Sequence, residues 1–312
     1  MGRSPAAPIR NVLTFDVEDY FHVSAFDTAG ARARWDSREP RIEQNTDGIL
    51  RLLDAASVTA TFFVLGWVAD RHPALVRRIA AAGHEIASHG YWHQLVYHLT
   101  PTQFRDDLRR AKRAIEDACG LDVVGYRAPS FSVTRRSLWA LDVLVDEGYR
   151  FDSSVFPIVR DRYGLPGAPR QPHVIARAGG SIVEVPPSTV RVAGLTVPVA
   201  GGGYFRLYPY SWTRRAIARV NRAEGQPAIV YLHPWEFDPE QPAQQGTLLN
   251  RFRHYVNLDR TAPRLRRLLG DFAFGPMRDL VQSVEEHPAN ATLAALPALH
   301  SATPAASRPR AA

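Results

Sequence analysis

The sequence predicts an α/β fold built on a parallel sheet or barrel, and two observations carry this prediction. Apolar, strand-like runs alternate with amphipathic helical segments between residues 10 and 152, and the connections between them are short. That alternation is typical of repeated strand–helix–strand units. Polar side chains, namely Asp16, His89, Arg127 and Asp152, follow directly after the expected strands. Because α/β folds place their sites at the carboxyl ends of the strands, we expect these side chains to meet.

Each expected element in the first half of the chain has a local signal. The expected strands, rich in β-branched and aromatic residues, cover residues 10–16, 58–65, 84–88, 123–126 and 149–152. The expected helices cover residues 43–56, 70–82, 100–119 and 134–147. The third helix has the clearest start, with Thr100 as its cap and Pro101 at its first position. Gly83, Gly120 and Gly148 follow three of these helices and are expected to end them.

The second half of the chain is less regular. Its expected elements are a strand over residues 182–185, a helix over 210–224, a buried strand over 228–232 and helical residues beyond 261. His233 follows the buried strand directly, so it is expected at the same sheet edge as the other polar side chains. Gly201, Gly202 and Gly203 are consecutive, but no phosphate-loop pattern surrounds them, so a nucleotide site is not expected.

Composition narrows the class of protein. The chain has 312 residues, 45% of them hydrophobic and 22% charged, which is ordinary for a globular protein. Its net charge of +7 comes almost wholly from arginine, because Lys112 is the only lysine. The arginines are scattered and form no basic stripe, so we expect no nucleic-acid partner.

The chain is expected to be cytoplasmic. Cys119 is the only cysteine, so no intrachain disulfide can form. Residues 1–10 lack the apolar core of a signal peptide. No transmembrane segment is expected, since no run approaches the roughly 18 apolar residues that a spanning helix needs.

His89 and His93 form the most informative pair in the sequence. They are four residues apart, and on a helical turn that spacing places both imidazoles on one face. Imidazole is a common ligand for zinc and related divalent metals, and such sites usually add a carboxylate. Asp16, Glu18 and Asp19 supply three carboxylates directly after the first expected strand. A metal site at this edge of the sheet is therefore predicted.

Four motifs occur in an order that resembles the polysaccharide deacetylases, the NodB-homology enzymes of carbohydrate esterase family 4. They are Phe15-Asp16, Ser88-His89-Gly90-Tyr91-Trp92-His93, Gly125-Tyr126-Arg127-Ala128-Pro129 and Leu232-His233-Pro234. Their details are most similar to Helicobacter-type peptidoglycan deacetylases and to allantoinase-like relatives. The stretch from Gly201 to Tyr255 also resembles the deacetylases encoded at exosortase (PEP-CTERM) exopolysaccharide loci, which carry a C-terminal extension.

The resemblance implies a distorted (β/α) barrel of the NodB-homology type with fewer than eight strands and a C-terminal extension. The resemblance gives a deacetylase domain over residues 10–235. Composition predicts a flexible arm over residues 1–9, an extension over 236–286 whose aromatic and leucine residues pack on the barrel, and an Ala-, Pro- and Ser-rich disordered tail over 287–312.

The resemblance also implies roles for the site residues. One divalent metal, zinc with cobalt or nickel as alternatives, is held by His89, His93 and one acid. Asp16 is the implied base and Arg127 the residue that pairs with it and orients it. His233 is the implied general acid for the leaving amine.

One departure from the family pattern leaves the acidic ligand open. The common motif has two adjacent aspartates, but here Val17 follows Asp16. Glu18 shares a strand face with Asp16 by the two-residue period and is slightly favoured, and Asp19 is the alternative if a bulge turns it inward.

Two further sets of residues follow from the same comparison. The aspartate–tryptophan motif that usually supports the acid histidine is not recognisable, and Asp152 and Glu184 are the nearest candidates for its role. Trp92 and Trp235 stand beside expected site residues and are candidates to line a sugar-binding cleft.

The sequence therefore favours a metal-dependent hydrolase that removes N-acetyl groups from an amino sugar or polysaccharide in exopolysaccharide biosynthesis. The alternative enzyme is an allantoinase-like C–N hydrolase of a small cyclic amide. The third hypothesis is a non-catalytic sugar-binding relative, and the complete set of acid, histidine and arginine side chains argues against it.

Overall fold

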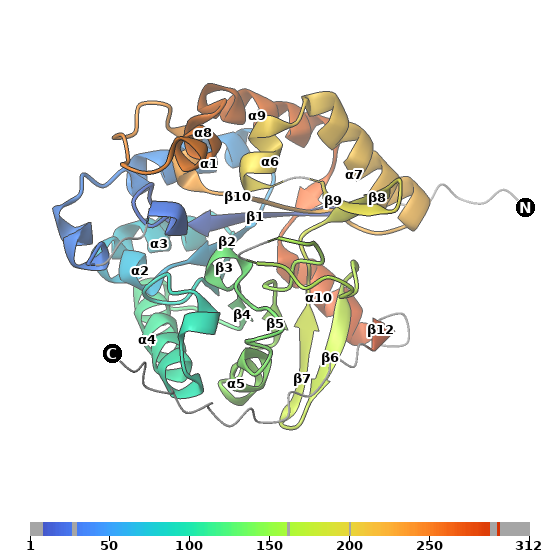
Figure 1. Cartoon of the computed structure of the whole chain (residues 1–312), viewed down its shortest axis with the longest axis horizontal. Coiled ribbons are helices and arrows are strands. Elements are labelled where there is room, and N and C mark those ends of the chain that lie inside the picture. The colour runs from blue at the N-terminus through green and yellow to red at the C-terminus, as the bar shows by residue number, and fades with distance from the viewer. Residues whose placement is uncertain (1–8, 27–29, 161–162, 200, 288–291, 294–312) are drawn as a thin grey trace, which may run out of the picture.

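The centre of the molecule is one sheet (Figure 1). The computed structural model describes residues 9–26, 30–160, 163–199, 201–287 and 292–293. The strands run in the order β10-β1-β2-β3-β4-β5-β7-β6-β12, with β11 beside the start of β1. Their bounds are β1 (Asn11–Val17), β2 (Thr61–Val64), β3 (Glu85–Ser88), β4 (Gly125–Tyr126), β5 (Phe151–Asp152), β6 (His173–Arg177), β7 (Gly180–Glu184), β10 (Ile229–Leu232), β11 (Phe274–Gly275) and β12 (Thr292–Leu293).

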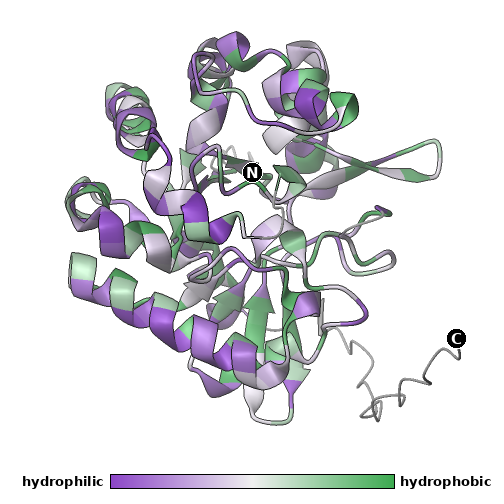
Figure 2. Ribbon diagram, turned by 60° about the vertical axis from the view of Figure 1, so that its left-hand side comes forward, coloured by the Kyte–Doolittle hydropathy of each residue, from purple (hydrophilic) through white to green (hydrophobic). Residues whose placement is uncertain are grey.

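Helices surround this sheet (Figure 1). They are α1 (Ile42–Ala55), α2 (Gly66–Arg71), α3 (Pro73–Ala81), α4 (Pro101–Cys119), α5 (Ala140–Asp146), α6 (Gly202–Leu207), α7 (Tyr210–Glu224), α8 (Leu248–Tyr255), α9 (Thr261–Asp271) and α10 (Met277–Glu286). In Figure 2 the strands are mostly green and the helices are banded in purple and green. The helices therefore turn an apolar face to the sheet and a polar face outward, as amphipathic helices do.

The sheet brings one set of strand ends together. From β10 through β1, β2, β3, β4 and β5 to β7, each strand runs parallel to its neighbour. Every residue of β1 and β2 is buried, as expected where helices cover both faces. The predicted α/β fold is thus confirmed, and the carboxyl ends of these strands lie along one edge.

Among the described residues the outermost strands of the sheet are β10 and β12, and no strand pairing joins β7 to β10. Ser188, just after β7, spans this gap. Its backbone N–H donates to the carbonyl of Ile229 over 3.2 Å, and its hydroxyl oxygen accepts from the N–H of Ile229 over 2.7 Å. A single residue thus joins the segment after β7 to β10, where a fully regular barrel would have a strand pair.

Two expected helices differ from the structure for reasons visible in the sequence. The helix expected over residues 70–82 is two helices, α2 and α3, because Pro73 restricts His72 and opens a new helix. The helix expected over residues 134–147 begins only at Ala140, since hydrogen-bonded turns precede it. By contrast, α4 starts as predicted, with a capping box between Thr100 and Gln103.

Several elements of the second half were not predicted. They are β6, the hairpin β8 (Thr189–Val192) and β9 (Leu195–Pro198), the strand β11 and the helices α6, α8 and α10. Of the predicted tail over residues 287–312, the structure describes His287 and the short strand β12, which pairs with β6. The rest of that tail, and residues 1–8 of the predicted arm, lie outside the described residues. Within the described part of the chain, no helix combines the length and apolarity needed to cross a membrane.

Candidate active site and metal centre

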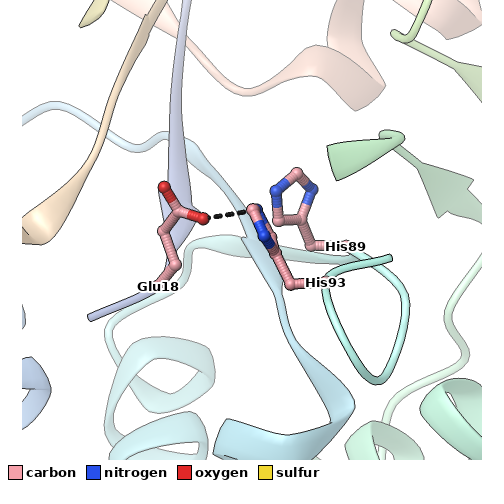
Figure 3. A group of neighbouring side chains, drawn as sticks. All are labelled: Glu18, His89 and His93. Carbon is pink, nitrogen blue, oxygen red and sulfur yellow. Dashed lines mark ion pairs between the residues drawn. The ribbon is translucent and has the colours of Figure 1, made fainter. Parts of the chain in front are cut away.

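A compact group of potential metal ligands lies at the carboxyl edge of the sheet (Figure 3). Glu18, His89 and His93 each offer one ligand atom, and these atoms all lie within 4.8 Å of one another. The side chains of Glu18 and His93 are about 5% and 4% exposed, and Nε2 of His93 lies 2.6 Å from Oε2 of Glu18. A carboxylate and two imidazoles converging in a buried site form a donor set that suits zinc and similar divalent metals.

The segment that carries the two histidines is a loop and not the helical turn predicted from their spacing. Gly90 and His93 adopt φ values of +74° and +51°, which reverse the chain between the two imidazoles. Asp107 on α4 holds the loop, because its carboxylate accepts the backbone N–H groups of Tyr91 and Trp92 over 2.8 and 3.2 Å. The loop therefore brings the imidazole rings to a centroid separation of 5.3 Å.

His89 is held in the form that a metal ligand needs. Its Nδ1–H donates to the carbonyl of Arg127 over 2.8 Å, and since a carbonyl only accepts, Nε2 keeps its lone pair. Burial lowers the pKa of His89 to about 4, which keeps the imidazole neutral. This arrangement and the convergence of the three ligand atoms show that the residues present fit a divalent metal.

Glu18 is fixed at the end of β1. Its backbone N–H donates to the carbonyl of Asp16 over 2.9 Å, and this tight turn directs its side chain toward the histidines. Its Oε1 accepts the indole N–H of Trp235 over 3.1 Å. Burial alone raises the pKa of Glu18, but the contact with His93 outweighs burial and holds that pKa well below the ordinary range. Glu18 is therefore an ionised carboxylate.

Asp16 and Arg127 form a buried ion pair beside the ligand group. Nη1 of Arg127 donates to Oδ1 of Asp16 over 2.6 Å, and the Arg127 side chain is 0% exposed. The same guanidinium donates to the hydroxyls of Thr14 and Ser153 over 2.8 and 2.9 Å. These bonds fix the Asp16 carboxylate in one orientation, with Oδ2 left to face the site.

His233 closes the site from the end of β10. Its Nε2 lies 3.7 Å from Oδ2 of Asp16 and 3.6 Å from Oε1 of Glu18. Its Nδ1–H donates to Glu236 over 2.5 Å. Burial alone lowers the pKa of His233, but the bond to Glu236 and the nearby carboxylates outweigh it and raise the pKa to about 9. His233 is thus a protonated imidazole, and its side chain is 16% exposed against 3% for Asp16.

Asp19, the alternative acidic ligand, is directed away from the histidines. Its Oδ2 accepts the backbone N–H groups of Arg41 and Ile42 over 2.7 and 3.0 Å, where α1 begins. Its Oδ1 accepts the N–H of Tyr20 over 2.8 Å. The geometry therefore assigns Asp19 to the start of α1 and favours Glu18 as the ligand.

Because Glu18 faces the histidines and Asp19 faces α1, substitutions at these two residues should affect different properties. Glu18→Ala should remove bound metal, because one of three ligands is lost. Asp19→Ala should keep the metal but lower the free energy of unfolding by about 1–3 kcal/mol, since buried N–H groups lose their acceptor. Metal analysis and thermal unfolding of both variants check this, and metal loss on Asp19→Ala alone would reverse the assignment.

Asp152 and Glu184 do not take the predicted role beside the acid histidine. They face each other across β5 and β7, are 0% exposed and hydrogen-bond to Ser154 and Val155. Burial raises the pKa of both carboxyl groups, to about 6 for Asp152 and well above its usual value for Glu184. They support the loop whose Ser153 contacts Arg127, and Glu236 orients His233 instead.

Of the two tryptophans expected near a cleft, Trp235 is 6% exposed and stacks with two histidine rings. Its ring stacks with His233 at 5.3 Å and with His254 at 4.2 Å, so little of the ring is left open to a sugar. Trp92 is partly buried and packs against Tyr91 and Arg110.

The glycine-rich stretch found in the sequence belongs to this site. A Cβ added to Gly201 would lie 2.2 Å from the ring of Tyr231, so the backbone can approach β10 only as glycine. Gly202 has a φ of +45°, and a Cβ added to it would lie 3.5 Å from the ring of His233. Glu236, Arg206 and Asp107 were missed by sequence reasoning, and only Glu236 carried a local signal, as an acid three residues after His233.

Two family models match adjoining parts of this chain. Residues 12–150 match the model described as polysaccharide deacetylase. Residues 153–282 match the model described as a domain of unknown function, DUF3473. The first match covers the ends of β1, β3 and β4, and the second covers the end of β10.

Curated relatives match about a third of this chain. The chitooligosaccharide deacetylase of Bradyrhizobium sp. (strain ANU 289) is 36% identical over 100 residues, which are 32% of this chain and 43% of that protein. The peptidoglycan deacetylase of Helicobacter pylori is 28% identical over 107 residues, which are 34% of this chain and 36% of that protein. The chain thus spans less than half the length of these relatives.

A solved structure resembles the chain along nearly its whole length. It is a crystal structure from Mycobacterium smegmatis, described as a candidate polysaccharide deacetylase, with a TM-score of 0.63 and 22% sequence identity. The match covers 95% of this chain and 99% of that one. At this identity the likeness establishes the shared fold.

Proposed function

From the match of residues 12–150 to the polysaccharide deacetylase family model, we propose that the chain is a metal-dependent hydrolase that removes N-acetyl groups from an amino sugar or polysaccharide. The observation that carries the proposal is one cluster at the strand ends. The ligand atoms of Glu18, His89 and His93 lie within 4.8 Å of one another, and Nε2 of His233 lies 3.6 Å from Glu18 and 3.7 Å from Asp16. Amide hydrolysis needs an activated water, a polarised carbonyl and a proton for the leaving amine, and this cluster offers groups for each.

The metal ligands, Asp16 and His233 are proposed to have different roles in the reaction, which follow from their contacts. A metal held by Glu18, His89 and His93 would lower the pKa of a bound water and polarise the acetyl carbonyl. Asp16, whose Oδ1 is held by Arg127, accepts the proton of the attacking water at Oδ2. His233, protonated and partly exposed, donates a proton to the leaving nitrogen. The 3.7 Å between the two groups lets both reach one substrate.

The finer proposals rest on the sequence. Zinc is the proposed metal, with cobalt or nickel as alternatives, because the donor set is two imidazoles and one carboxylate. Exopolysaccharide biosynthesis is the proposed setting, supported by the resemblance of residues 201–255 to deacetylases of exosortase loci. A cytoplasmic location is proposed from the lone Cys119 and would be tested by cell fractionation.

The test is acetate release by the purified, metal-analysed protein. The panel contains chitooligosaccharides, peptidoglycan fragments, N-acetylated exopolysaccharide and a small cyclic amide such as allantoin. We expect acetate from at least one N-acetylated glycan, loss of activity after chelation and recovery with zinc. Turnover of the cyclic amide alone would replace this proposal by the other C–N hydrolase, and binding of a glycan without turnover would make the chain a sugar-binding relative.

A further inference from the structure

A chain of contacts connects the acid histidine to the C-terminal part of the molecule. His233 donates to Oε1 of Glu236, and Oε2 of the same carboxylate accepts from Nε of Arg206 over 3.3 Å. The Glu236 and Arg206 side chains are 0% and 1% exposed. A buried carboxylate shared between an imidazole and a guanidinium has little freedom to rotate, so its position sets the direction of the His233 ring.

Arg206 in turn is held by the end of α8. Its Nη1 donates to the carbonyls of His254 and Val256, each over 2.8 Å, and its Nη2 donates to the carbonyl of Arg253 over 3.1 Å. These are carbonyls at a helix C-terminus, which lack partners within the helix and favour a positive charge. The end of α8 therefore fixes the position of the guanidinium, and Nε is left to face Glu236.

A second set of contacts ties the same helix to the residues after His233. The ring of His254 stacks on Trp235 at 4.2 Å, and its Nε2–H donates to Gln241 over 2.7 Å. Gln241 donates to the carbonyls of Trp235 and Asp238. Since Trp235 also donates to Glu18, α8 contacts both the proton-donor side and the metal-ligand side of the site.

We propose that Arg206 is a positioning residue for the acid histidine, and that α8, in the part of the chain matching the domain of unknown function, contributes to catalysis by holding Arg206 and through it Glu236 and His233. The inference rests on the proposed function, because it assigns a role within the same reaction. It assigns a catalytic role to the C-terminal extension, namely to hold the residues that orient His233.

A positioning role for Arg206 and a purely structural role predict different effects on amide and ester hydrolysis. Hydrolysis of an N-acetyl group needs a proton on the leaving amine, whereas the phenolate of p-nitrophenyl acetate leaves without one. A misdirected His233 should therefore slow the amide reaction and spare the ester reaction. Loss of folded protein or of metal would lower both reactions together.

The first test compares the two reactions in Arg206→Met and in Glu236→Gln. In each variant we expect kcat for acetate release from the N-acetylated glycan to fall about 10–100-fold. Ester hydrolysis should stay within about threefold of the wild type, because it needs no proton donor. Should Arg206→Met fail to fold, Glu236→Gln alone carries the test, since it keeps the shape and the acceptor oxygen but removes the charge. Equal losses on the two substrates would overturn the proposal.

Arg264→Met is the matched control. Arg264 also donates to three carbonyls beside this network, those of Phe205, Arg206 and Tyr208, but it makes no bond to Glu236. Its removal should lower the melting temperature while leaving the ratio of amide to ester rates unchanged. A changed ratio in this control would mean that any local loosening mimics the effect, and would overturn the assignment to Arg206.

An NMR measurement needs no substrate and so separates this inference from the proposed function. In 15N-histidine-labelled, zinc-loaded protein, the Nδ1 proton of His233 should appear far downfield, as its bond to a carboxylate requires. It should shift or vanish in Arg206→Met and Glu236→Gln and stay unchanged in Arg264→Met. An unchanged signal in Arg206→Met would overturn the inference, whereas a wild type without deacetylase activity would overturn only the proposed function.

Discussion

Replacing both His89 and His93 by alanine should abolish metal binding and acetate release together. Two of the three converging ligands are then gone, and Glu18 alone cannot hold a divalent ion. The loop itself should survive, because Asp107 holds it through the backbone N–H groups of Tyr91 and Trp92. Metal analysis of the purified double variant, with circular dichroism to show that it is folded, measures the effect.

His98→Ala is the matched control for this experiment. His98 lies five residues beyond His93 in the same segment and is exposed, with its ring packed edge-on against Tyr97. Its loss should leave metal content and activity at the wild-type level. Full metal occupancy in the double variant would show that the site lies elsewhere.

Asp16→Asn should leave the metal bound while turnover falls by about 10²–10⁴-fold, the usual worth of a positioned base. Asparagine keeps an oxygen that accepts from Arg127, so the buried guanidinium retains its partner. The amide has no useful basicity, so the attacking water loses its proton acceptor. Metal content and kcat measured on the same preparation check both halves of this expectation.

Loss of metal in Asp16→Asn would contradict the division of roles at the end of β1. Asp16 would then be a ligand and Glu18 the better candidate for the base. Arg127→Lys supplies an independent check, because lysine cannot bond Asp16, Thr14 and Ser153 at once. It should lower kcat with metal retained, as Asp16→Asn does.

The edge of the sheet could be predicted from sequence because each strand carries its own signal. The apolar runs before Asp16, His89 and His233 identify buried strands, and parallel strands in such a fold share one carboxyl edge. Once those strands are placed, their following residues must meet. The choice of Glu18 over Asp19 was also favoured by the two-residue period of β1.

The local geometry of the histidine loop could not be predicted in the same way. A spacing of four residues suggested a helical turn, but His93 adopts a left-handed backbone with φ of +51°. What holds it there is Asp107, which is distant in sequence and shows no pattern of its own. Spacing alone cannot reveal a loop whose shape depends on a tertiary contact.

The residues that hold His233 also differ in whether the sequence could reveal them. Glu236 lies three residues away in a short turn and could have been proposed from the sequence. Arg206 could not, because its bonds reach Glu236 and the end of α8 across 30 to 50 positions of the chain. Buried polar networks of this kind are set by packing, so they become visible only in the folded molecule.

The central claim is that Glu18, His89 and His93 hold the metal on which hydrolysis depends. Anomalous diffraction from crystals of the zinc-loaded, active protein, recorded on both sides of the zinc absorption edge, tests it most directly. We expect one strong peak within bonding distance of all three side chains, lost in crystals of Glu18→Ala. An active protein whose anomalous peak lies elsewhere, or which shows none between these side chains, would contradict the claim.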